Sequence, residues 1–200
     1  KGQEYLSIPT QNKGNFFQKI NEVLLHEPKK NKNRIIKTIY FNYKNSKYFN
    51  KYFPEVEDVL NKDYEKLIDL NLAIINLGKK FFNIKIKMDL SSSFNIDEKK
   101  EKLIEDLAIA NKANEVLSTD GVKSYLKDFR SKNIHHRFFS YRNEKFQLEG
   151  SDSKLNNLSF IDLIFRNGTY SREILKEKIF FSHPYEKNIL IQSFTPVKFP

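Results

Sequence analysis

Strand-like and helix-like patterns alternate through the second half of the chain, and this alternation constrains the fold more than any other feature. Apolar and polar residues alternate over residues 84–88 and 134–141, and a shorter strand-like segment covers residues 115–118. Helical spacing predicts a helix that begins at Asp97 and another that begins at Gly121. Strand–helix–strand units favour right-handed crossovers and a parallel sheet. We therefore expect an α/β fold, with a parallel-containing sheet flanked by helices and an α-helical segment in the first half.

The first half of the chain reads mainly as helix. Residues 29–50 carry apolar side chains at helical spacing, and residues 55–82 predict one long helix or two shorter ones. Pro54 either breaks the first helix or starts the next, because proline lacks an N–H and fits a first helical turn. Short alternating patterns at residues 5–9 and 19–25 predict two brief strands ahead of these helices.

The composition fits one domain with a sizeable core and a basic surface. The chain has 200 residues, of which 39% are apolar, and its 18 Phe and 10 Tyr supply enough ring surface for a core. The net charge is +10, with 35 basic residues against 25 acidic ones. Most basic residues are lysines spread along the chain, whereas phosphate recognition favours the arginine fork. A nucleic-acid partner is therefore not expected.

Several classes of site are disfavoured by what the sequence lacks. The absence of cysteine excludes disulfides, thiolate zinc sites and a cysteine nucleophile, and it is compatible with a reducing cytoplasm, where we expect the protein. No run of 18 apolar residues occurs, so we expect no transmembrane segment. His135 and His136 are adjacent on a predicted strand and point to opposite faces, so we expect no metal site. No cofactor is indicated, because the sequence has no glycine-rich phosphate loop and no dinucleotide fingerprint.

Two polar loops follow predicted strands, where open α/β sheets bind their ligands. The better candidate combines hydroxyls, a flexible glycine, the free N–H groups of a helix start and a lysine, which together suit a phosphate or another anion. Its residues are Ser118, Thr119, Asp120, Gly121 and Lys123. Plain capping of the next helix explains the hydroxyls equally well. The other loop is centred on Ser92, and a solvated turn is the better interpretation of its three serines.

Ser159 and Asp162 mark the start of a helix near residues 158–168. Their spacing is that of a capping box, in which the serine oxygen accepts the N–H three residues on and the carboxylate reaches back. Gly168 suits a left-handed helix stop. Asp162 is thus either a catalytic carboxylate or part of the cap. Near the end of the third predicted strand, Tyr141 and Gln147 are candidates to line the same site and to contact a sugar, although Gln147 also suits an ordinary surface position.

Six segments occur in an order that resembles the WbqC-like protein family. The similarity extends from Tyr5 to about Gly168 and is carried by Tyr5-Leu-Ser-Ile-Pro9, Lys19-Ile-Asn-Glu22, the tyrosine-rich residues 43–49, Asp69-Leu-Asn-Leu72, residues 117–126 and residues 158–168. We expect a family domain over residues 1–170, lacking the family's first strand and helix, and a C-terminal extension over residues 171–200. The chain has Thr119 where the family usually has glycine.

The resemblance implies a pathway more firmly than a reaction. The family is associated with bacterial surface-polysaccharide gene clusters, those of O-antigen and lipopolysaccharide. Within that pathway, the most economical mechanism is a group transfer that involves a nucleotide-activated sugar, with an amino sugar as one candidate. In this interpretation the loop at residues 118–121 holds a phosphate, Lys123 counters its charge, and Asp162 or Tyr141 orients the sugar. The alternatives are a non-catalytic protein that binds or scaffolds a glycan precursor, and a nucleic-acid-binding domain driven by the +10 charge.

Overall fold

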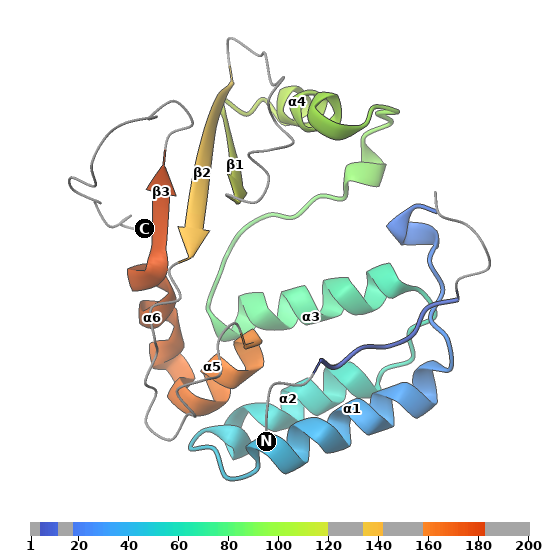
Figure 1. Cartoon of the computed structure of the whole chain (residues 1–200), viewed down its shortest axis with the longest axis vertical. Coiled ribbons are helices and arrows are strands. Elements are labelled where there is room, and N and C mark those ends of the chain that lie inside the picture. Colours follow the sequence, from blue (N-terminus) through green and yellow to red (C-terminus); the bar gives the residue numbers. More distant parts are fainter. Residues whose placement is uncertain (1–4, 12–17, 120–133, 142–157, 183–200) are drawn as a thin grey trace. The chain divides into compact units, whose positions relative to one another are not determined.

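The computed structural model describes residues 5–11, 18–119, 134–141 and 158–182, and the chain divides into two compact units (Figure 1). The first unit comprises residues 1–86 and 145–172, and the second comprises residues 87–144 and 173–200. The first unit is built from helices, and the second contains a small sheet. The expected α/β class, with helices in the first half and a parallel strand pair, is therefore confirmed.

Three helices form most of the first unit: α1 (Pro28–Tyr43), α2 (Phe49–Asn61) and α3 (Leu67–Phe81). Pro28 occupies the first turn of α1, where its missing N–H costs no helical hydrogen bond. The apolar stripe of α1 buries Ile35, Ile36 and Ile39 against the other helices. The predicted helix at residues 29–50 is thus confirmed but ends earlier, and residues 55–82 contribute to two helices.

Pro54 neither ends nor starts a helix but lies inside α2, as its sixth residue. Proline at this position removes the hydrogen bond that an N–H would donate to the carbonyl of Asn50, four residues earlier. Asn50 and Pro54 are both exposed, so water can reach that carbonyl. The opposite side of α2 buries Phe53 and Val56, and this packing keeps the helix continuous through the proline.

The two short strands expected at residues 5–9 and 19–25 are not formed. The structure has the 3₁₀ turn η1 (Ile20–Glu22) and two isolated bridges, Thr10 with Leu25 and Leu24 with Lys66. The two apolar positions of residues 5–9 are enough to suggest alternation, but a strand also needs a neighbour along its whole length. Here the two bridges are isolated, so neither segment has a continuous strand partner among the described residues.

An aromatic cluster joins a distant segment of the chain to these helices. Helix α5 (Phe160–Asn167) packs on α2, and its Phe165 is completely buried. The Phe165 ring meets Phe49 edge-on at 5.2 Å between centroids and Tyr43 at 5.4 Å, while Phe49 stacks on Phe53 at 4.4 Å. Such pairs contribute about 0.5–1.5 kcal/mol each beyond the area they bury. The cluster therefore holds residues 158–172 on a core made by the first 86 residues.

Gly168 ends α5 at a positive φ, which suits glycine, but its ψ of −135° differs from that of the left-handed stop that the sequence predicts. Its φ is 55°, and a Cβ built there would lie 2.9–3.1 Å from the ring of Tyr48. The N–H of Tyr48 donates to the carbonyl of Phe165 at 2.9 Å, which draws the two segments together. The 3₁₀ turn η4 (Gly168–Tyr170) and helix α6 (Ser171–Lys178) follow.

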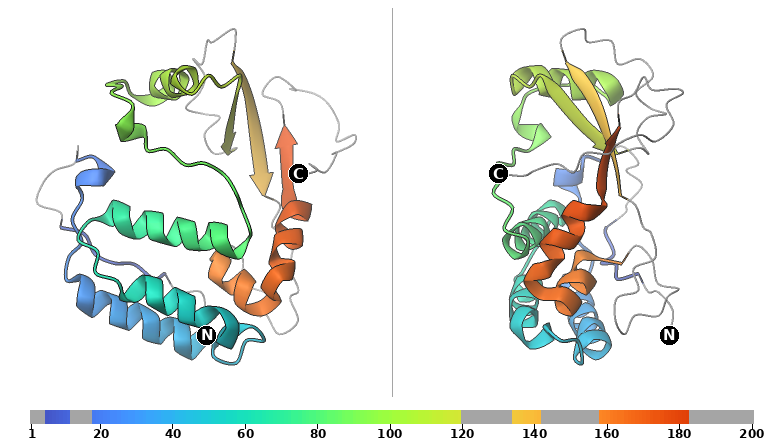
Figure 2. Two further views of the ribbon diagram at one scale, coloured as in Figure 1. Left: turned by 180° about the vertical axis from the view of Figure 1, so that it is seen from behind. Right: turned by 90° about the vertical axis from the view of Figure 1, so that its left-hand side faces the viewer.

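The second unit contains a three-stranded sheet in the order β1 (Glu115–Thr119), β2 (His135–Tyr141), β3 (Ile179–Ser182) (Figure 2). Strands β1 and β2 are parallel, as the alternation of patterns predicts, and β2 and β3 are antiparallel. Strand β3 comes from the residues expected to form a C-terminal extension, and its place in the sheet was not predicted. Helix α4 (Lys100–Ala110) precedes β1, and its N-cap is Lys99 instead of Asp97.

The strand expected at residues 84–88 is also wrong. These residues belong to no helix or strand, are exposed and have no strand partner among the described residues. Their backbone bonds locally, because the N–H of Ile84 donates to the carbonyl of Lys79 and the Lys79 ammonium donates to the carbonyl of Ile86. An alternating pattern predicts a strand only where one face is covered, and here Ile86 is 61% exposed.

The two described glycines inside helical segments predict opposite effects of alanine. In Gly168→Ala the alanine must adopt a positive φ, and its methyl group meets the Tyr48 ring. We therefore expect a loss of about 1–3 kcal/mol in unfolding free energy. Gly78→Ala is the matched control, because its Cβ would lie 3.7 Å from the Phe160 ring, an ordinary contact. Alanine in a helix interior should there add roughly 0.5–1 kcal/mol. Denaturant titration of both variants measures the difference, and equal effects would contradict it.

Candidate functional site

A serine and a histidine meet on the two parallel strands of the second unit. In the register of β1 and β2, Val116 pairs with His136 and Ser118 pairs with Phe138. Alternate residues of a strand share a face, so these four side chains lie on the same side of the sheet. The Ser118 Oγ and the His136 Nε2 are 2.8 Å apart, within hydrogen-bond distance.

The surroundings of His136 favour its neutral form. Its ring stacks on Phe138 with centroids 4.7 Å apart and planes 9° from parallel. Partial burial removes water from the imidazole and lowers the pKa of His136. A neutral imidazole protonated on Nδ1 can accept the hydroxyl proton of Ser118 at Nε2. A hydroxyl paired with a neutral base is the arrangement from which a serine can act as a nucleophile.

An ion pair on the other face of the sheet is compatible with this register. The guanidinium Nε of Arg137 lies 2.8 Å from the carboxylate of Glu115, across β1 and β2. Both side chains are partly exposed, so the pair contributes about 0–1 kcal/mol. A slip of one residue would turn Ser118 or His136 to the opposite face. His135 is exposed, and His136 is half-buried beside Ser118, which confirms that the adjacent histidines point to opposite faces.

Of the predicted ligand loop, the structure describes Ser118 and Thr119. Ser118 and Thr119 are the last two residues of β1, so both lie at the carboxyl end of a parallel strand. Ser118 is half-buried and Thr119 is exposed. The other predicted loop residues, Asp120, Gly121 and Lys123, lie outside the described residues, and so does Gln147. Tyr141 is the last residue of β2, and only its backbone is described. The phosphate-binding role of this loop stays a prediction.

Ser92 lies in the 3₁₀ turn η2 (Ser91–Ser93) and is exposed. The segment before it forms no strand, so Ser92 does not follow the carboxyl end of a sheet strand as predicted. The neighbouring Ser93 hydroxyl donates to the carbonyl of Leu90 at 2.7 Å, which closes the turn. Its geometry fits the interpretation of these serines as a solvated turn.

Asp162 does not complete the capping box that the spacing predicts. The Ser159 Oγ accepts from the N–H of Ile161, two residues on, at 3.4 Å, and the N–H of Asp162 bonds to the backbone carbonyl of Ser159. The Asp162 carboxylate instead accepts from the Nε of Arg166 at 2.8 Å and from the hydroxyl of Tyr43. Asp162 is buried, and a buried carboxylate requires such partners, which the helix N-terminus alone does not supply.

Tyr43 connects this carboxylate to helix α1. Burial raises the pKa of Tyr43 first, and the negative charge of Asp162 and the hydrogen bond to it raise that pKa further. Arg166 acts in the opposite direction on the pKa of Tyr43. The three side chains form a network between α1 and α5. Sequence reasoning missed Tyr43 because it counted the residue as part of an apolar stripe, whereas the i, i+4 spacing of Asp162 and Arg166 was a readable signal.

A cavity of about 530 Å³ lies in the first unit beside this network. Its walls come from residues 5–8, from helices α1, α2 and α3, and from the start of α5. Aliphatic side chains dominate the lining, and Tyr43, Asn71 and Ser159 supply polar groups. The size is typical of ligand pockets. The apolar lining suits a hydrocarbon group better than a sugar, which requires many hydrogen-bond partners.

The described residues contain no group of three or more His, Asp or Glu side chains that could hold a metal ion. None of the helices in the described part of the chain has the length and the apolar character that crossing a membrane requires.

Replacing the Tyr43 hydroxyl should change how stability depends on pH. Because the pKa of Tyr43 is raised in the folded protein, its contribution is complete below about pH 10, the ordinary value, and declines as the pH rises above it. In Tyr43→Phe we expect a loss of about 1–3 kcal/mol at pH 7, since Asp162 loses a donor, and a smaller further loss above pH 10. Urea titrations at both pH values test this, and an equal alkaline loss in both proteins would contradict it.

Comparison with known proteins identifies the family of the chain. Searches of curated proteins and of solved structures find no match. A model of the WbqC-like protein family matches residues 1–174, which include α1, α2, α3, α5 and the parallel strand pair. The match covers most of the chain and includes every segment on which the resemblance was based. The chain therefore belongs to the WbqC-like protein family.

Proposed function

We propose that this protein transfers a group to a nucleotide-activated sugar, such as an amino sugar, during bacterial surface-polysaccharide biosynthesis in the cytoplasm. Membership of the WbqC-like family supports the pathway, through the association of the family with such gene clusters. The observation that carries the proposal of catalysis is the contact of 2.8 Å between the Ser118 Oγ and the His136 Nε2. This contact places a neutral imidazole beside a hydroxyl at the carboxyl end of a strand, which is the pairing that nucleophilic catalysis by serine requires.

In the proposed reaction, His136 takes the proton of Ser118 while the serine oxygen attacks the group that is to be transferred, which its donor carries in activated form. An acyl group fits this chemistry best, because a serine hydroxyl and a histidine base form an ester intermediate readily. His136 returns the proton to the leaving group. It then takes a proton from the amine or hydroxyl of the sugar, which attacks the ester carbonyl, and passes this proton to the departing Ser118 oxygen, so that the serine hydroxyl and the neutral histidine are restored.

Nucleotide binding is assigned in this proposal to the loop that follows Ser118. The carboxyl end of β1 is where open α/β sheets bind ligands, and Thr119 is exposed there. Gly121 and Lys123 are the residues proposed to bind the phosphates. Asp162 is assigned a structural role, because its carboxylate is buried and engaged by Arg166 and Tyr43.

Substitution of the two proposed catalytic residues should abolish transfer without abolishing binding. A thermal-shift screen against nucleotide sugars identifies the substrate first, since a ligand at about 100 times its Kd adds roughly 2.7 kcal/mol of stability. We then expect Ser118→Ala and His136→Ala each to lower kcat by about 10²–10⁴ with little change in the thermal shift. His135→Ala is the matched control, because His135 is the adjacent, exposed histidine on the opposite face. Full activity in His136→Ala would show that His136 is not the base, whereas a thermal shift without turnover in the unmodified protein would indicate a glycan-precursor-binding role.

The pH profile supplies an independent measurement. The base must be neutral, and burial lowers the pKa of His136, so the neutral form persists below the ordinary value of about 6.5. We expect kcat to be constant near pH 7 and to fall on the acidic side with a midpoint below about 6.5. An acidic limb centred above that value would indicate that another group is the base.

A further inference from the structure

A long stretch of the first unit carries basic residues and no acidic ones. Between Pro28 and Pro54 the chain has eight basic residues, namely Lys29, Lys30, Lys32, Arg34, Lys37, Lys44, Lys47 and Lys51. The chain as a whole has 25 acidic residues for 35 basic ones, so a general surplus of lysine does not explain a stretch without acids. Lysines are therefore not only spread along the chain, as sequence reasoning held, but also concentrated on α1 and the turn after it.

Helical geometry gathers part of this charge on one outward face of α1. Lys30, Lys37 and Lys44 are spaced by seven residues, so they lie in a row along the helix. Tyr40 and Phe41 border the row, and all five residues are exposed. The buried residues of α1 lie on the opposite side of the helix, and α1 packs against α2. These five exposed residues are called the α1 lysine face below.

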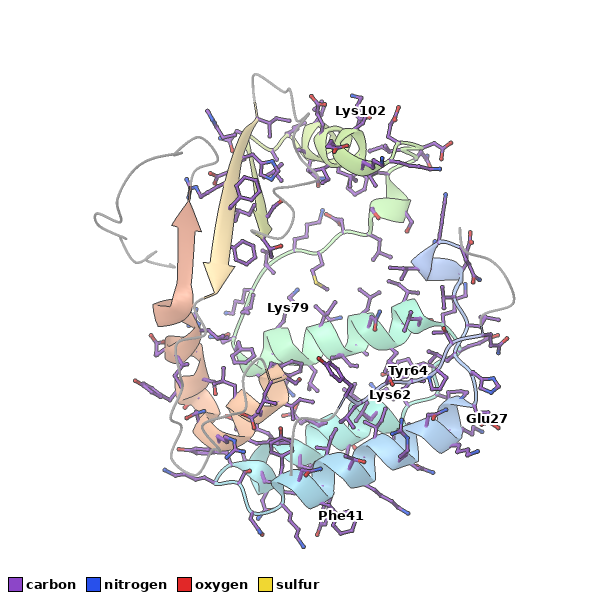
Figure 3. All side chains as sticks on the ribbon, viewed as in Figure 1. Glu27, Phe41, Lys62, Tyr64, Lys79 and Lys102 are labelled. Atoms are coloured by element: carbon purple, nitrogen blue, oxygen red, sulfur yellow. The ribbon has the colours of Figure 1, made fainter. Side chains whose placement is uncertain are left out.

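Other basic residues of α1 are engaged within the protein. Lys32 bonds to Asp63 at 2.9 Å, and Arg34 donates to the carbonyl of Ser7 at 3.0 Å. On the α1 lysine face, Lys30 is 3.5 Å from Glu27 at the N-terminal end of the helix. Glu27 lies at the opposite end of α1 from Phe41 (Figure 3). The positive charge is thus least compensated around Lys37 and Lys44, beside Phe41.

Phe41 is unusual in its exposure. It is 68% exposed, and no other phenylalanine among the described residues is classed as exposed. Its ring points outward from the helix (Figure 3), with the ammonium of Lys44 5.7 Å from its centroid. Tyr40 meets it edge-on at 5.6 Å. The Tyr40 ring also packs edge-on against the buried Phe49 and Phe53, so Phe41 is the ring that extends furthest into water beside these lysines.

We propose that the α1 lysine face binds the surface of an anionic lipid bilayer. Lysines along a helix attract acidic headgroups without needing a fixed phosphate geometry, and each contributes about fivefold in affinity. Phe41 can enter the boundary between headgroups and acyl chains, and Tyr40 keeps its hydroxyl in the headgroup layer. Nucleic acid is the weaker match, because specific phosphate contacts favour arginine, and the α1 lysine face has none. The face thus brings the protein onto a membrane without crossing it.

Vesicle flotation tests this surface directly. We expect the protein to float with vesicles that contain roughly 30% phosphatidylglycerol and not with pure phosphatidylcholine. Binding should disappear when salt rises from about 0.1 M to about 1 M, because the Debye length falls from about 10 Å to about 3 Å. Lys37→Glu/Lys44→Glu should weaken binding at least tenfold. Phe41→Ser should weaken it less, and it serves as the second variant because an exposed ring contributes little to folding.

A charge-matched control separates the face from net charge. Lys85→Glu/Lys99→Glu reverses two exposed lysines elsewhere, so it changes the net charge equally. The proposal predicts that this control binds anionic vesicles within about threefold of the unmodified protein. Equal losses in both double variants, or equal binding to neutral vesicles, would overturn it. Failure to bind vesicles, together with oligonucleotide binding that Lys37→Glu/Lys44→Glu abolishes, would assign the face to nucleic acid instead.

Discussion

The first unit depends on the contact between Phe165 of α5 and the aromatic rings of α1 and α2. Phe165 is completely buried, and the segment that carries it lies more than a hundred residues along the chain from Phe49. The same approach brings Tyr43 to Asp162 and the N–H of Tyr48 to the carbonyl of Phe165. Gly168 then has to lie against the Tyr48 ring. One burial event thus explains an aromatic cluster, a buried carboxylate network and a glycine.

In the second unit, parallel pairing has the corresponding role. It is the register of β1 and β2 that brings Ser118 within 2.8 Å of His136. Phe138 lies on the same face of the sheet as Ser118 and His136 and stacks on the His136 ring. Partial burial lowers the pKa of His136 and so favours the neutral imidazole. Strand pairing therefore brings an imidazole and a hydroxyl together without a dedicated loop motif. No short sequence motif announces such a contact, because the two residues come from different strands.

Sequence reasoning succeeded where one segment carries its own signal. Residues 29–50 present an apolar stripe at helical spacing, and α1 forms over the first part of this range. It failed where a pattern needs a partner: Ile84 and Ile86 alternate like a strand but remain exposed. It also misassigned Asp162, because the capping-box spacing is local, whereas the side chain bonds to Tyr43 more than a hundred residues away. The candidate loop residues were identified by composition, but the contact of Ser118 with His136 was not.

The sequence by itself determined the periods and charges of the elements: the helices of the first half, the parallel character of the sheet and the family. These properties depend on neighbours within a few turns or residues, so spacing alone reveals them. Only the tertiary structure decided which side chains meet. Asp162 turned away from its own helix terminus toward Tyr43 and Arg166, and His136 met a serine. The physical reason is that a buried polar group takes whichever partner the packing brings within hydrogen-bond distance, and that choice is made between segments far apart in the chain.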